Sequence, residues 1–176
     1  NRTITVPVAN DLSYETNELF NLVLSSPSGE GTVGTNDTVA VTITDNDSQL
    51  SFDTNAVSVA ENAGTVSLTV NRTGTLTTTN SIYYSAIQGT ARTTDYTSTN
   101  GILTFGPNET NATITVSIGE DSIVESDEYF TVRLSNPTGG AVLTGTNIAV
   151  ITITVDNAGL EFSSPVFSTN ENGRIV

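Results

Sequence analysis

The sequence predicts an all-β fold, an antiparallel β-sandwich of about seven strands per domain in tandem repeats. Three observations support this prediction. Thr, Val and Ile alternate with polar residues in short runs, which is the period of a half-buried strand. Gly, Asn, Asp and Pro bound these runs, and no segment has convincing helical periodicity. The chain also repeats itself at an offset of 110 residues.

The repeat defines the predicted domains. Asp11, Glu15, Glu18 and Phe20 recur as Asp121, Glu125, Glu128 and Phe130, and Glu61-Asn62 recurs as Glu171-Asn172. A repeat of this length is a whole domain rather than one turn of a solenoid. We therefore predict the C-terminal half of one domain at 1–47, a complete domain at 48–157 and the start of a third copy at 158–176.

The strands of the complete domain follow from the alternation. The clearest predicted strands are 66–70, 112–118, 130–134 and 149–155, and weaker patterns predict strands at 50–52, 57–60, 81–86 and 102–105. Asn100-Gly101 is typical of a tight hairpin turn. The links at 45–49 and 155–159 are short and polar, so we expect them to hold neighbouring domains close together.

The two partial domains cannot complete each other, because both lack the strands that match residues 67–110. The simpler interpretation is that the chain is a segment of something longer. The alternative is an assembly in which neighbouring molecules donate strands to one another.

The composition excludes several function classes. The chain has no Cys and no His, which removes the usual zinc and copper ligands, the common general base and the thiol nucleophile. The net charge of −14 argues against nucleic acid and anionic membranes as partners and favours cations. No apolar run is long enough to insert into a membrane. We therefore expect a protein that is not an enzyme.

Seven acidic residues of the complete domain lie where strand ends can converge at one pole of a Greek-key sandwich. They are Glu61, Asp95, Glu120, Asp121, Glu125, Glu128 and Asp156. Crowded carboxylates repel one another, and five Arg residues are too few to neutralise them. A hard divalent cation can do so, and a loop-built cluster of carboxylates suits Ca²⁺ better than Mg²⁺.

Two other interpretations of this cluster remain. A run of carboxylates on a loop is often only a solvated face, although recurrence of the same acids in two copies favours a metal. Paired carboxylates such as Asp121 and Glu125 could also serve a glycosidase. The repetition of the domain argues for an architectural role instead.

The motifs taken in series resemble the Calx-β domain family. They are Glu61-Asn62-Ala63-Gly64, Gly89-Thr90-Ala91, Asp95-Tyr96, Asp121 with Glu125-Ser126-Asp127-Glu128-Tyr129-Phe130, and Leu134-Ser135-Asn136-Pro137 with Gly139. The resemblance implies a seven-stranded, immunoglobulin-like Greek-key sandwich with Ca²⁺ at one pole. It covers the complete domain and both partial copies.

The resemblance also implies roles for single residues. Glu61, Asp95, Glu120, Asp121, Glu125, Glu128 and Asp156 would be side-chain ligands, and Ile123 would bind through its carbonyl oxygen. In the first copy, Asp11, Glu15, Glu18, Asp45 and Asp47 occupy matching places. Calcium-binding members end in three Asp residues, whereas the complete domain ends in Val155-Asp156-Asn157. We therefore expect fewer or weaker ions in the complete domain.

The expected function is a structural or adhesive repeat module of a large extracellular or cell-surface protein. Calcium at the pole would rigidify the junctions between neighbouring repeats. One alternative is a calcium-independent adhesin or a filament subunit that assembles into fibres through strand or surface contacts. A second alternative is a calcium sensor domain.

Overall fold

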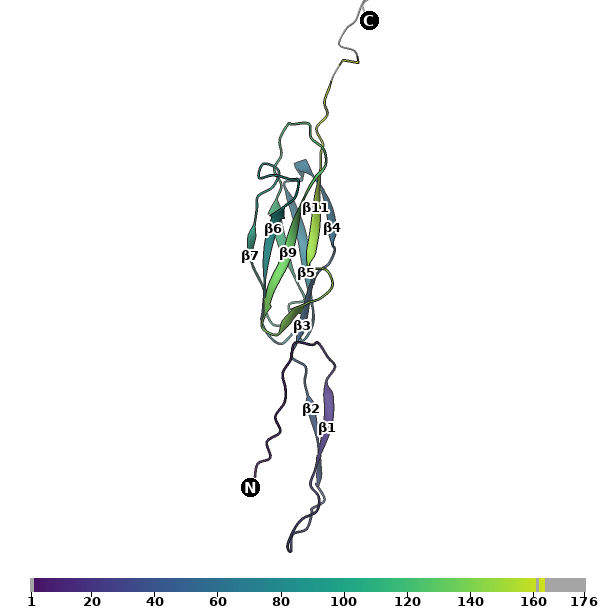
Figure 1. Ribbon diagram of the computed structural model, residues 1–176, viewed down its shortest axis with the longest axis vertical. Helices are drawn as coiled ribbons and strands as arrows, with labels where there is room; N and C mark the ends of the chain where they lie inside the picture. Colours follow the sequence, from purple (N-terminus) through teal and green to yellow (C-terminus); the bar gives the residue numbers. More distant parts are fainter. Residues whose placement is uncertain (1, 161, 164–176) are drawn as a thin grey trace, which may run out of the picture.

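The computed structural model describes residues 2–160 and 162–163. A β-sandwich occupies the middle of an elongated molecule, and a two-stranded hairpin extends from one end of it (Figure 1). Residues 164–176 and Glu161 are not described, so the predicted match of Glu61-Asn62 with Glu171-Asn172 and most of the predicted third copy lie outside the described residues. The described part of the chain contains no helix that is long and apolar enough to cross a bilayer.

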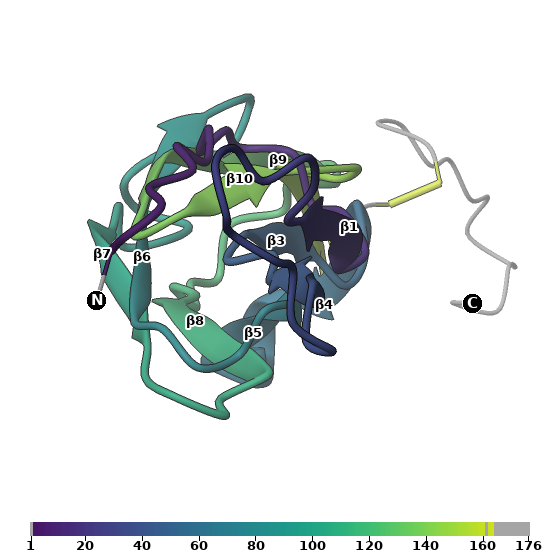
Figure 2. The same cartoon turned by 90° about the horizontal axis from the view of Figure 1, so that it is seen from below.

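Two sheets pack face to face in the sandwich (Figure 2). The four-stranded sheet has the order β10 (Ala141–Leu143), β3 (Ser48–Phe52), β5 (Thr65–Gly74) and β8 (Asn111–Ser117). The five-stranded sheet has the order β4 (Ala56–Ala60), β11 (Ile148–Thr154), β9 (Glu128–Thr138), β6 (Asn80–Gln88) and β7 (Asn100–Phe105). The prediction of an all-β sandwich is confirmed.

The first strand of the sandwich is divided between the two sheets. β3 lies antiparallel to β5 and parallel to β10, and after a short turn β4 lies parallel to β11. The turn is closed by the Thr54 hydroxyl, which donates to the Ala56 carbonyl oxygen at 3.0 Å. These two parallel pairs at the sheet edges are a feature that the alternation of side chains does not reveal, because it is the same for both strand directions.

The hydrophobic core lies between the sheets and explains the period-two pattern. Leu50, Val70, Phe105, Phe130 and Ile151 come from both sheets, and none of them has measurable exposure. Successive side chains of a strand point to opposite faces, so alternate apolar residues meet in this one core.

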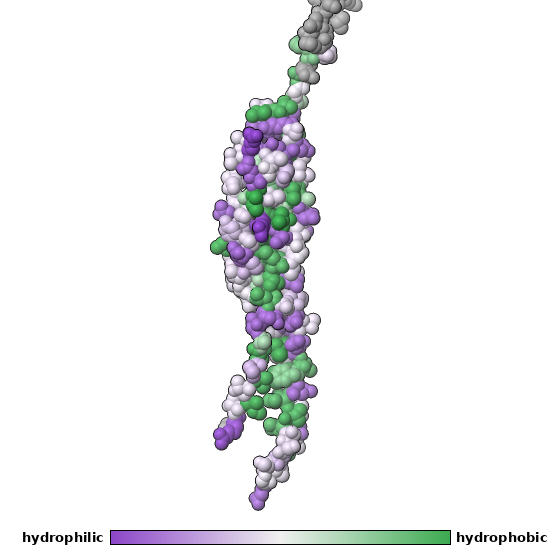
Figure 3. Space-filling model, in the orientation of Figure 1, coloured by the Kyte–Doolittle hydropathy of each residue, from purple (hydrophilic) through white to green (hydrophobic). Residues whose placement is uncertain are grey.

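The hairpin below the sandwich repeats the pairing of two sandwich strands. β1 (Glu18–Val23) pairs with β2 (Thr38–Ile43) so that Phe20 faces Val41, and β9 pairs with β11 so that Phe130 faces Ile151. The two registers are identical at the offset of 110 residues. The hairpin has no second sheet to cover it among the described residues, and apolar side chains lie on its surface (Figure 3). Leu19, Val23 and Val39 are exposed, whereas Phe20 and Val41 are half-buried.

Two local predictions differ from the structure. Asn100-Gly101 is not a turn but the first part of β7, where Gly101 faces Tyr84 of β6. A Cβ atom at Gly101 would lie 2.9 Å from the Tyr84 hydroxyl, so a larger residue here would displace that side chain. The short strand β10 is not predicted, because three residues are too few to show alternation.

Candidate metal site

The candidate site lies at the end of the sandwich opposite the hairpin, where three loops and one strand end meet (Figure 1). Glu61 begins the 3₁₀ helix η1 (Glu61–Ala63) that follows β4. Asp95 lies in the loop between β6 and β7, and the segment 119–127 connects β8 to β9. Glu128 is the first residue of β9, and Asp156 follows the end of β11.

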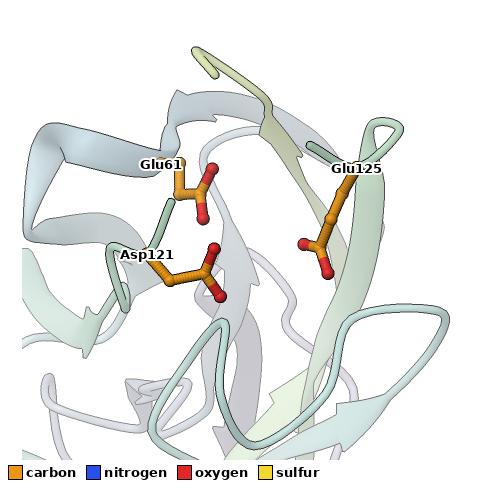
Figure 4. A group of neighbouring side chains, drawn as sticks. All are labelled: Glu61, Asp121 and Glu125. Carbon is orange, nitrogen blue, oxygen red and sulfur yellow. The ribbon is translucent and has the colours of Figure 1, made fainter. Parts of the chain in front are cut away.

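The structure brings five of the predicted ligands into two groups that share one member. Glu61, Asp121 and Glu125 form one group, and Asp95, Glu125 and Glu128 form the other. Within each group, one carboxylate oxygen from each residue lies within 4.8 Å of the others. Figure 4 shows the carboxyl groups of Glu61, Asp121 and Glu125 facing a common space. Glu125 therefore lies at the centre of the candidate site.

The remaining predicted ligands lie outside these two groups. Glu120 is exposed, and Asp156 is exposed and accepts a hydrogen bond from the side-chain amide of Asn62. The carbonyl oxygen of Ile123 does point into the site, where it accepts a hydrogen bond of 3.3 Å from the Asn157 amide.

Close packing of the backbone positions the loops of the site. A Cβ atom at Gly119 would lie 2.0 Å from the Thr94 carbonyl oxygen, and the Gly119 amide donates to the Asp95 carbonyl oxygen at 2.8 Å. The Tyr96 ring stacks on Phe130 with 4.0 Å between the ring centroids. This packing joins the loop of Asp95 to the segment 119–127 and to the core.

The pKa values of the neighbouring carboxyl groups Asp95 and Glu128 shift in opposite directions. Burial opposes ionisation of Asp95, but hydrogen bonds from the Thr94 hydroxyl and the Arg92 amide, both 2.6 Å long, help to hold its pKa below the usual range. The hydrogen bond to Asp95 is the largest cause that raises the pKa of Glu128 to about 7, with smaller contributions from burial and from the charges of Asp95 and Glu125. Without a cation, Asp95 and Glu128 therefore share a proton near neutral pH.

Glu61 is the most deeply buried carboxylate of the pole, with 3% of its surface exposed. Burial is the largest cause that raises its pKa, and the negative charges of Asp121, Glu120 and Asp156 add to it. A buried carboxylate surrounded by like charges is unfavourable unless a donor or a cation compensates it.

Asn157 supplies part of this compensation, although the sequence offered it only as a departure from three consecutive Asp residues. Its side-chain amide nitrogen donates to the carbonyl oxygens of Asp121 (3.0 Å) and Ile123 (3.3 Å) and to Glu61 Oε2 (3.5 Å). The hydrogen bonds of this one residue therefore converge on the oxygens of three predicted ligands.

The first copy has a second cluster, at the junction between the hairpin and the sandwich. A cavity there is lined by Asp11, Glu15, Glu18, Asp45 and Asp47, together with neighbouring polar and apolar residues. These five acids form no group as tight as the two above among the described residues. The charges of Asp11 and then Glu18 are the main causes that raise the pKa of Glu15.

Asp47 is the most unusual member of this second cluster. Only 2% of its surface is exposed, and its Oδ1 atom has no hydrogen-bond partner. Burial is the largest cause that raises its pKa, followed by the charges of Asp45 and Asp11. The Oδ2 atom of Asp45 is likewise buried without a partner. Buried carboxylate oxygens of this kind need a partner, and a cation is one that can supply it.

The donor set as a whole is chemically selective. It offers carboxylate and backbone oxygens without nitrogen or sulfur ligands, which matches hard divalent cations and excludes a conventional zinc or copper site. Ca²⁺ takes about 6–8 such ligands at about 2.3–2.6 Å in flexible geometry, so loop-borne carboxylates of this kind fit it well.

These features define a class of protein, a β-sandwich repeat with a carboxylate-rich pole. The family model of the Calx-beta domain matches residues 1–47 and 44–157. The chain therefore belongs to the Calx-beta family.

Similar full-length proteins share this domain within much larger chains. The chain is 33% identical over 124 residues to the sodium/calcium exchanger Calx of Drosophila melanogaster, covering 69% of this chain and 13% of that protein. It is 34% identical over 132 residues to the human extracellular matrix organizing protein FRAS1, covering 71% of this chain and 3% of that protein. The zebrafish (Danio rerio) adhesion G-protein coupled receptor V1 is 31% identical over 189 residues, covering 99% and 3%.

Solved structures support the same fold. The apo form of the Calx CBD1 domain superimposes with a TM-score of 0.61 at 30% identity, covering 63% of this chain and 99% of that chain. The calcium binding domain CBD12 of CALX1.1 gives a TM-score of 0.60 at 31% identity, covering 61% and 44%.

Proposed function

We propose that this chain is a non-catalytic module of a larger extracellular or cell-surface protein, in which Ca²⁺ at the poles of the sandwiches stiffens the junctions between repeats. The observation that carries this proposal is Asp47, a buried carboxylate with an unpartnered oxygen at the point where one repeat joins the next. The similarity to solved calcium binding domains supports calcium as the ion.

The junction offers a direct mechanical link between the first cluster and the following sandwich. Asp47 immediately precedes β3, and its carbonyl oxygen accepts a hydrogen bond of 2.9 Å from the Thr75 amide. The Thr75 hydroxyl donates to the Asp45 carbonyl oxygen at 2.8 Å. Gly74 packs closely against Tyr14 of the first copy. An ion that fixes Asp45 and Asp47 would therefore also fix the position of the β5–β6 loop.

The loop is in turn held by a buried arginine. Arg72 of β5 is 2% exposed and donates to the carbonyl oxygens of Gly106 (3.0 Å), Thr75 (2.9 Å) and Thr78 (2.7 Å). Because all three acceptors are backbone atoms, Arg72 holds the β5–β6 loop against the sandwich at the junction. An ion that holds Asp45 and Asp47 would then be connected through Thr75 and Arg72 to the strands of the sandwich.

The far pole is the end of the sandwich opposite the hairpin. We propose that calcium also binds there, among the carboxylates of Glu61, Asp95, Asp121, Glu125 and Glu128. Glu120 and Asp156 lie too far out to join these groups without a movement of their loops. Calcium there would tie η1, the loop of Asp95 and the segment 119–127 together. It would also remove the repulsion that these groups suffer in its absence.

A thermal melt of the whole chain in EDTA, across a calcium series and with magnesium as a control, tests this function. A ligand at a hundredfold excess over its Kd adds about 2.7 kcal/mol to the free energy of unfolding. For a domain of this size, that raises Tm by about 10 °C. We expect the rise with calcium and not with magnesium. Equal melts in EDTA and calcium would overturn the proposal and favour a calcium-independent adhesin or a filament subunit.

The half-point of the same series separates a clamp from a sensor. Extracellular calcium modules bind at about 10⁻⁴–10⁻³ M, whereas sensors bind at about 10⁻⁷–10⁻⁵ M. A millimolar half-point would support the structural role at the cell surface. A micromolar half-point would replace it with the sensor function, for which the similarity to the exchangers is the motivating observation.

A further inference from the structure

The side chain of Asn157 occupies the inner part of the far pole. Its amide nitrogen lies 3.0 Å from the Asp121 carbonyl oxygen, 3.3 Å from that of Ile123 and 3.5 Å from Glu61 Oε2. Two backbone carbonyl oxygens and a buried carboxylate are the ligand types that Ca²⁺ prefers. Here they surround the NH₂ group of a side chain instead.

An amide NH₂ group and a cation can both satisfy the same oxygen acceptors. The NH₂ group carries two donor hydrogens and a partial positive charge, so it satisfies oxygens that an ion would otherwise bind. It also fills the space, because its nitrogen is at hydrogen-bond distance from all three oxygens. An ion cannot occupy the same position while the amide stays in place.

The first copy shows the contrasting arrangement at the matching position. Asp47 lies 110 residues before Asn157, and an aspartate side chain can only accept. Its Oδ1 atom is buried and lacks a partner, whereas the amide of Asn157 is fully engaged. One contact of the preceding loop is the same in both copies, since Asp11 Oδ1 accepts from the Ser13 amide at 2.7 Å as Asp121 Oδ1 does from the Ile123 amide.

We propose that Asn157 is a specificity-determining residue that closes one cation subsite of the far pole. Its amide nitrogen takes the place of an ion between Glu61 and the carbonyl oxygens of Asp121 and Ile123. With this inner subsite closed, calcium at this pole is held only at the outer positions that the carboxylates of the two groups surround, so the pole binds one ion fewer than it would with an aspartate at position 157. This inference deepens the proposed function and rests on it for the identity of the ion.

The isosteric variant Asn157→Asp tests the inference in the whole chain, with calcium stoichiometry measured by isothermal titration calorimetry. Replacing the donor by a carboxylate opens the inner subsite, so we expect about one additional Ca²⁺ per chain. Asn111→Asp is the matched control, because Asn111 is exposed at the start of β8 and makes the same change of charge far from the pole. The control is expected to keep the wild-type count.

A second measurement on the wild-type protein does not depend on the folding of a variant. In ¹⁵N-labelled protein, the side-chain NH₂ signals of Asn157 should remain protected from exchange with solvent when calcium is saturating. If the amide instead turned its oxygen towards an ion, these signals would move and exchange rapidly. That result, or an unchanged stoichiometry in Asn157→Asp, would overturn the inference.

Failure of the inference can be distinguished from failure of the proposed function. A wild type that responds to calcium, with an Asn157→Asp variant of equal stoichiometry, contradicts only the role of Asn157. A wild type that binds no calcium, with a variant that gains one ion, supports the role of Asn157 and contradicts the proposed function.

Discussion

Glu125→Gln should raise the stability of the calcium-free protein and reduce its response to calcium. Glu125 belongs to both carboxylate groups, so its charge lies within 4.8 Å of oxygens of Glu61, Asp121, Asp95 and Glu128. Two unit charges at that separation repel by about 0.9 kcal/mol at the dielectric constant of water. Two or three ionised neighbours, reduced by salt screening, make the removed repulsion about 1–2 kcal/mol.

The same substitution removes a charged ligand from both groups. In EDTA we expect Tm to rise by about 4–8 °C, because about 1 kcal/mol corresponds to about 4 °C for a domain of this size. In saturating calcium the variant should gain less than the wild type, so the two effects have opposite signs. A general change in stability would move both conditions in the same direction.

Differential scanning calorimetry of the whole chain, with and without calcium, measures both effects. Glu30→Gln is the matched control, because Glu30 is exposed in the loop of the hairpin and loses the same charge. The control should melt like the wild type in both conditions. A Glu125→Gln variant that melts below the wild type in EDTA, or that keeps the full calcium response, would refute this reasoning.

Two further predictions concern protons and the junction. The pKa of Glu128 is about 7 in the folded protein, against an ordinary value of 4.5 that applies to the unfolded chain. The contribution of this carboxyl group to stability is therefore complete below about pH 4.5 and is lost as the pH rises through 7. In EDTA, Tm should therefore fall between pH 5 and pH 8, and Glu128→Gln should flatten this dependence; a slope that the variant leaves unchanged would assign the effect elsewhere. Thr75→Val removes the hydrogen bond from the hydroxyl to the Asp45 carbonyl oxygen and should cost about 1 kcal/mol. It should also broaden the distance distribution in small-angle X-ray scattering with calcium present, and an unchanged distribution would place the stiffness of the junction elsewhere.

The sequence predicts the sandwich well because its information is periodic. Alternating apolar residues such as Val66, Leu68 and Val70 lie on one buried face of β5, as the period of a strand requires. The repeat does not give the register, but it implies that matching strands share one, and β1 with β2 and β9 with β11 do have the same pairing. The parallel edges depend on the path of the first strand between the sheets, which no local pattern encodes.

Turn chemistry is a weaker guide than alternation. Asn-Gly is a strong hairpin signal because both residues tolerate positive φ. In this chain, however, Gly101 leaves room for the Tyr84 side chain, and neither Asn100 nor Gly101 adopts positive φ. A close approach to a distant side chain and a tight turn make the same demand for glycine, and the local sequence does not distinguish them.

For the candidate site, topology predicts which loops meet but not which atoms do. Glu120 and Asp121 are adjacent in sequence, yet Asp121 enters a carboxylate group and Glu120 is exposed. The Ile123 amide donates a hydrogen bond to Asp121 Oδ1 within that loop, and Gly119 at its start packs closely against the Thr94 carbonyl oxygen. Hydrogen bonds of this kind are local details that become visible only when the loop is folded.

The two copies together separate what shapes the pole from what determines its charge. Asn17 Oδ1 accepts from the Asp45 amide at 3.3 Å, and Asp127 Oδ1 accepts from the Val155 amide at the same distance. An amide and a carboxylate therefore serve equally well in holding the end of the last strand. Loop shape can thus be kept while the charge varies, because a backbone amide requires only an oxygen acceptor. If that holds for the matching positions of Asp47 and Asn157 as well, exchanging Asp for Asn there changes the number of bound ions while the fold of the sandwich stays the same.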